Sequence, residues 1–125
     1  MAQILNEMAR VGYFDDFEII IWTDDSGNIP HMHIRDRSTH GDKFHCCIRL
    51  DNPEYFSHGG KEDRLNSKQI KSLLNFLKST SKIGKTEINN WDKVIMYWND
   101  NNSNVILNDD IPIPDYRLLN EEVLI

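Results

Sequence analysis

Two short segments decide the fold: Pro30-His-Met-His-Ile-Arg35 and Lys43-Phe-His-Cys-Cys-Ile-Arg49, separated by the polar turn 36–42. Side chains on a β-strand alternate between its two faces. If the segments pair as a hairpin, one face is apolar and the other is polar. The polar face then carries His31, His33, His45 and Cys47.

The segment before this hairpin, Phe17-Glu-Ile-Ile-Ile-Trp-Thr23, is β-branched or aromatic at most positions, which favours a strand. Its nearly continuous apolar character predicts a central strand that is covered on both faces. Strands at 17–23, 31–35 and 44–50 therefore form an antiparallel meander. Residues 1–12 have the spacing of a short amphipathic helix that ends at a glycine.

Two amphipathic helices are predicted after the meander. Asn66 and Gln69 have the spacing of a capping box ahead of residues 67–78, where apolar residues recur at helical intervals. Asn89 is the predicted cap of a second helix over 90–98.

The whole chain, 1–125, is predicted to form a single α+β domain. In this domain an antiparallel meander of three or more strands, over 17–50, packs against two helices over 66–98. Residues 1–16 form an N-terminal segment and residues 99–125 an extended C-terminal arm. Prolines at positions 112 and 114 favour an extended backbone in this arm.

Composition limits the functions that the chain can have. Its 125 residues include 14 Lys and Arg against 20 Asp and Glu, for a net charge of −6, which argues against bulk nucleic-acid binding. No apolar run approaches the roughly 20 residues of a membrane helix. Cys46 and Cys47 are adjacent and should point to opposite faces of a strand, so no disulfide between them is expected. Cys46 is expected to be buried and Cys47 partly exposed, and free thiols indicate the cytoplasm.

The histidines of the polar face form a candidate metal site. A His-x-His strand directs both rings to the same side, and neutral imidazole is the commonest nitrogen ligand. The alternative is a partly exposed strand face with hydrogen-bonded histidines. The candidate ligands are His31, His33 and His45, with Asp36, Asp42 or Cys47 as an additional ligand.

A second candidate site lies in the loop His58-Gly-Gly-Lys-Glu62. Two glycines permit close approach of the backbone to an anion, and a helix follows the loop. His58, Lys61 and Arg64 are the candidate ligands. The alternative is an ordinary turn ahead of a helix.

The run Ile29-Pro-His-Met-His-Ile34 resembles the Pro-Pro-His-Phe-His-Val signature of a family of small bacterial proteins, domain of unknown function family 4160. The resemblance covers about residues 17–78 and implies a meander followed by helices. Members are often encoded beside toxin–antitoxin or mobile-element genes. Here Ile29 stands for the first proline and Met32 for the phenylalanine.

The second half of the chain, 91–116, is similar to small uncharacterised proteins of gut Bacteroidales and their phages. The similarity lies in Trp98-Asn-Asp-Asn-Asn102 and Pro114-Asp-Tyr116. Neither resemblance implies a catalytic residue. Both imply a phage or mobile-element accessory protein.

These features favour a small cytoplasmic binding or regulatory protein over an enzyme. Its ligand is expected to be a host protein or a small anion, because an acidic chain suits a partner with a basic surface. Two alternatives stay open: a hydrolase that uses a divalent metal on the His-x-His strand, and a nucleotide-sequestering protein that uses Lys61 and Arg64. Apolar side chains in 111–125 favour a homodimer through the C-terminal arm.

Overall fold

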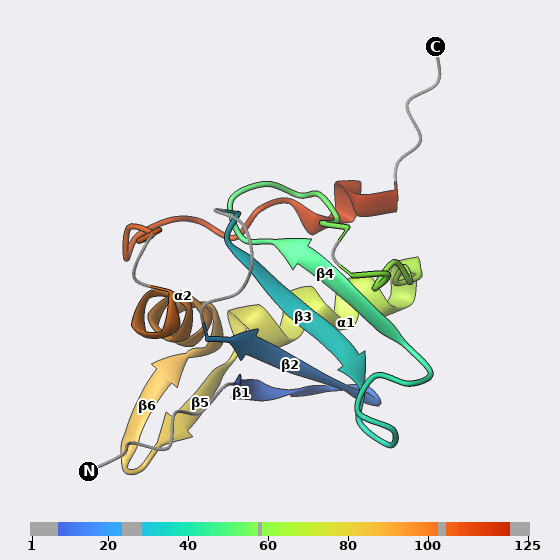
Figure 1. The fold of residues 1–125 in the computed structure, drawn as a ribbon. Helices are drawn as coiled ribbons and strands as arrows, with labels where there is room; N and C mark the ends of the chain where they lie inside the picture. The colour runs from blue at the N-terminus through green and yellow to red at the C-terminus, as the bar shows by residue number, and fades with distance from the viewer. Residues whose placement is uncertain (1–7, 24–28, 58, 103–104, 121–125) are drawn as a thin grey trace, which may run out of the picture.

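The computed structural model describes residues 8–23, 29–57, 59–102 and 105–120. It has the predicted α+β architecture, in which an antiparallel meander packs against two helices (Figure 1). The sheet has four strands in the order β1-β2-β3-β4. Their bounds are β1 (Met8–Phe14), β2 (Phe17–Trp22), β3 (His31–Asp36) and β4 (His45–Arg49).

Helices α1 (Ser67–Lys78) and α2 (Asn90–Asn101) are joined by a separate hairpin that projects beside α2 in Figure 1. The hairpin consists of β5 (Thr80–Ile83) and β6 (Thr86–Asn89), and a 3-10 helix, η1 (Tyr116–Asn120), follows near the end of the chain. The capping box of α1 is confirmed, and the Asn89 side chain accepts hydrogen bonds from the backbone of α2. None of the helices in the described ranges is long and apolar enough to cross a membrane.

Strand β1 corrects the helix that was predicted for residues 1–12. Residues 8–12 belong to an extended strand paired with β2, while residues 1–7 lie outside the described part of the chain. Pairing with the apolar β2 decides the conformation of this segment over its local helical spacing. Gly12 does not end a helix: a Cβ on Gly12 would lie 2.5 Å from the ring of Phe76, so glycine lets α1 approach the strand.

The hydrophobic core lies between one face of the meander and the two helices. Each of the four strands of the meander contributes to it, and α1 covers this face in Figure 1. The apolar strand and helix positions of the sequence predict seven buried side chains, and one of them, Trp22, is only half-buried. The others are buried, as predicted: Ile20, Ile48, Leu73, Leu77, Val94 and Trp98.

The arm packs on the body of its own chain over residues 111–120. The indole Nε1 of Trp91 donates to the carbonyl oxygen of Ile111 at 2.7 Å, and the buried Tyr116 hydroxyl donates to that of Arg49 at 2.6 Å. Residues 121–125 lie outside the described ranges. A homodimer through the arm stays a prediction, which light scattering on the full chain can test.

The turn between β3 and β4 is built around the carboxylate of Asp36. Hydroxyl and backbone donors satisfy both oxygens, which is the usual role of an aspartate in a turn. Hydrogen bonds from Thr39, above all from its hydroxyl, outweigh desolvation and hold the pKa of Asp36 below its ordinary value of 3.8. Its six donors are the Ser38 and Thr39 hydroxyls and the backbone amides of Thr39, Gly41, Lys43 and Phe44.

Asp36→Asn is expected to destabilise the chain at neutral pH, with an effect that shrinks in acid. A depressed folded-state pKa contributes stability above the unfolded value near 3.8, and this stability is lost as pH falls toward the folded value. Urea denaturation from pH 7 to pH 2.5 measures the effect. The control is Asp42→Asn, which removes the same charge from an exposed position of this turn. A gap between Asp36→Asn and wild type that is as large at pH 2.5 as at pH 7 would contradict the account.

Candidate metal centre

The pairing of β3 with β4 brings the polar side chains together. His33 lies opposite Cys47 and Arg35 lies opposite His45. Met32 and Ile34 point into the core, so the predicted division between an apolar and a polar face is confirmed. The polar face is not exposed, however, because His31, His33 and Cys47 have exposed fractions of 0%, 1% and 1%.

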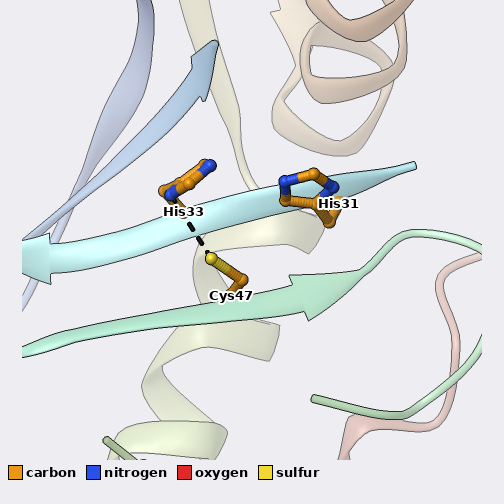
Figure 2. Close-up of side chains that lie close together, drawn as sticks. All are labelled: His31, His33 and Cys47. Atoms are coloured by element: carbon orange, nitrogen blue, oxygen red, sulfur yellow. Dashed lines mark hydrogen bonds between the residues drawn. The ribbon is translucent and has the colours of Figure 1, made fainter. Parts of the chain in front are cut away.

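His31, His33 and Cys47 form a compact group on this face, which we call the His–Cys cluster. Each residue offers one potential ligand atom that lies within 4.8 Å of those of the other two. Figure 2 shows both histidines on β3 and Cys47 on the neighbouring β4, with the thiol directed toward the ring of His33. Two adjacent strands of one sheet therefore position all three side chains.

A backbone carbonyl determines which ring nitrogen of His31 carries the hydrogen. The ring nitrogen Nδ1 lies 2.7 Å from the carbonyl oxygen of Ile29. A carbonyl oxygen can only accept a hydrogen bond, so Nδ1 carries the hydrogen. In the neutral ring the lone pair that can bind a metal is then on Nε2, and a hydrogen bond of this kind is typical of histidine ligands in metal sites.

His33 lies between a thiol and a second imidazole. Its Nδ1 atom is 3.3 Å from Sγ of Cys47 and 2.9 Å from Nε2 of His45. Of the three predicted histidine ligands, His31 and His33 thus belong to the His–Cys cluster, while His45 contacts it through His33. Cys47 was expected to be partly exposed and is instead buried, because neighbouring structure covers the polar face as well as the apolar one.

Aromatic rings surround the two histidines. The ring centroids of Phe56 and Trp98 lie 4.7 Å and 5.7 Å from that of His31, and the Trp22 centroid lies 5.8 Å from that of His33. A hydrophobic shell limits the access of water and lowers the local dielectric constant. Bonds between the cluster and a cation gain strength in such a medium.

The acidic residues near the cluster have other partners. Burial opposes ionisation of Glu18, but hydrogen bonds from His40 and Arg35 outweigh it and hold the pKa of the carboxyl below 4.5. Asp36, a possible additional ligand, is engaged in the β3–β4 turn, and Asp42 is exposed on that turn. The described geometry therefore favours nitrogen and sulfur ligands over oxygen.

The predicted anion site lies along the outer edge of β4. Isolated bridges join Ile48 to Tyr55 and Cys46 to Glu62, so the loop follows this edge. The Arg64 guanidinium stacks on the ring of Tyr55 at 4.7 Å. Lys61 Nζ lies 3.0 Å from where a Cβ on Gly59 would be, and His58 lies outside the described residues.

Comparisons of the chain with models of known protein families, with curated proteins and with solved structures find no match. The two resemblances noted in the sequence therefore stay expectations. The function has to be argued from the chemistry of the His–Cys cluster.

Proposed function

We propose that this chain is a small binding protein whose ligand is a transition-metal ion, with Zn²⁺ as the first candidate. His31, His33 and Cys47 supply its ligands. The convergence of two imidazoles and one thiol within 4.8 Å on a buried sheet face carries the proposal. Zinc is bound in proteins by this mixture of nitrogen and sulfur, whereas magnesium and calcium prefer oxygen.

The distances in the cluster suit a tetrahedral ion. Bonds of ~2.0–2.1 Å to nitrogen and ~2.3 Å to sulfur separate tetrahedral ligands by about 3.3–3.6 Å. Because the group spans at most 4.8 Å, side-chain shifts of about 1 Å would bring it onto the ion.

Burial supports a binding role over hydrolysis. A catalytic zinc keeps an open position that a substrate can reach, whereas the ligand side chains here are at most 1% exposed. The bound metal would then stabilise the sheet, or it would make the stability of the chain depend on the concentration of available metal. The fourth position of the ion is left for a water molecule.

The setting that we propose is a cytoplasmic accessory protein of a phage or mobile element. The net charge of −6 favours a host protein with a basic surface as its partner. Cys46 and Cys47 carry thiols and form no disulfide with one another, which is compatible with a reducing compartment.

The proposal predicts one zinc ion per chain. Elemental analysis and competition with a chelator, both under reducing conditions, measure stoichiometry and affinity. Cys47→Ser removes a ligand and should weaken binding by more than the roughly 10–100-fold that accompanies the loss of an outer-shell partner.

Cys46→Ser is the matched control for this measurement. Cys46 is the neighbouring thiol on the opposite, core-facing side of β4, and burial raises its pKa well above the ordinary value of 9.0. This variant should keep one zinc with unchanged affinity. A wild-type chain that takes up no zinc, copper or cobalt, or a Cys47→Ser variant that binds zinc as wild type does, would overturn the proposal.

A further inference from the structure

Each histidine of the cluster has a hydrogen-bond partner at Nδ1. Nδ1 of His31 faces a backbone carbonyl oxygen at 2.7 Å. Nδ1 of His33 faces Nε2 of His45 at 2.9 Å and, at the longer distance of 3.3 Å, the Cys47 thiol. If His33 also carries its hydrogen on Nδ1, both rings hold the metal-binding lone pair on Nε2. His45 then accepts a hydrogen bond from Nδ1–H of His33, as the carbonyl oxygen of Ile29 does from Nδ1–H of His31.

His45 is itself held by the structure around it. Its backbone N–H donates to Oδ2 of Asp63 at 2.9 Å, and its carbonyl oxygen accepts from the backbone N–H of Asp63 at 3.2 Å. On the other side its ring lies against Gly41. A Cβ on Gly41 would be 2.9 Å from His45 Nδ1, so glycine leaves the space that this ring occupies.

We infer that His45 is a positioning residue of the metal site, where it accepts a hydrogen bond from Nδ1–H of His33 and so fixes the tautomer and tilt of that ring. The inference rests on the proposed function and refines the sequence prediction that His45 is a ligand. The group of mutually close ligand atoms agrees with this refinement, because it contains Cys47 in place of His45. A partner of this kind typically changes metal affinity by about 10–100-fold without changing stoichiometry.

Variants of His45 separate the positioning role from a ligand role. His45→Leu removes the acceptor and should weaken zinc binding about 10–100-fold while keeping one ion per chain. His45→Gln offers an amide oxygen near the position of Nε2 and should restore affinity to within a few-fold. The absorption spectrum of the cobalt-loaded protein should keep its sulfur-to-cobalt band and tetrahedral intensity in both variants.

Variants of two glycines test whether zinc binding needs the space that Gly41 leaves for the His45 ring. Gly41→Ala introduces a side chain against the His45 ring at a φ of +102°. Gly84→Ala is the control: it has a φ of +62° and no atom within 4 Å of the added Cβ. Both substitutions strain the backbone, but only the first should weaken zinc binding.

Nitrogen-15 NMR of the imidazole rings tests the inference without metal. The metal-free wild type should carry the His33 hydrogen on Nδ1, and His45→Leu should lose this preference. A hydrogen on Nε2 of His33, equal zinc affinity in His45→Leu and wild type, or a changed cobalt spectrum in both His45 variants would overturn the positioning role. If the NMR result holds and wild type takes up no metal, only the proposed function fails.

Discussion

Leu73→Ala is expected to lower the free energy of unfolding by about 2–5 kcal/mol. Leu73 lies on α1 and is fully buried in the core between the helix and the sheet. Truncation to alanine removes apolar burial and leaves a cavity, and the cost depends on how far the surroundings relax. Urea denaturation followed by far-ultraviolet circular dichroism measures the change.

Leu74→Ala is the matched control, since Leu74 is the next residue of the same helix and is only half-buried. Its truncation should cost clearly less. A loss below ~1 kcal/mol in Leu73→Ala, or an equal loss in both variants, would show that α1 presents a different face to the sheet.

Removal of both histidines from the His–Cys cluster is expected to abolish metal-dependent stabilisation. A ligand that binds only the folded chain stabilises it by about 2.7 kcal/mol at 100 times Kd and by about 4.1 kcal/mol at 1,000 times Kd. Zinc should therefore raise the unfolding midpoint of the wild type but leave that of His31→Ala/His33→Ala unchanged. Thermal denaturation with and without zinc measures the difference.

Two further variants keep this test valid if the double variant folds poorly. Cys47→Ser changes one atom of the buried cluster and should also lose the response to zinc. His40→Ala removes a histidine that bonds to Glu18 at 3.1 Å and whose side chain is 63% exposed, so it should keep the full response. Equal stabilisation of all variants by zinc would place the metal elsewhere.

The sequence predicted the parts of the fold that have strong periodic patterns. The apolar run of β2, the alternation in β3 and β4 and the caps at Asn66 and Asn89 led to elements that the structure confirms. Strand β1 was missed because its pairing with β2 is a tertiary interaction. The β5–β6 hairpin was missed because its short strands are mostly exposed and carry no alternation of apolar and polar residues.

The candidate site was predicted in part. Alternation alone places His31 and His33 on one face, as the structure has them. The selection of Cys47 over His45 depends on register, which sets Cys47 opposite His33 on the adjacent strand. The burial of this polar face could not be predicted, because it depends on aromatic side chains from distant positions, among them Phe56 and Trp98.

X-ray absorption spectroscopy at the zinc edge tests the central claim most directly, because it reports the atoms bound to the ion. For the zinc-loaded wild type the account predicts one sulfur at ~2.3 Å, with nitrogen or oxygen ligands at ~2.0–2.1 Å that include two imidazoles. In Cys47→Ser the sulfur contribution should vanish, and in Cys46→Ser it should remain. A first shell without sulfur in the wild type, or one that is rich in carboxylate oxygen, would contradict the assignment of zinc to the His–Cys cluster.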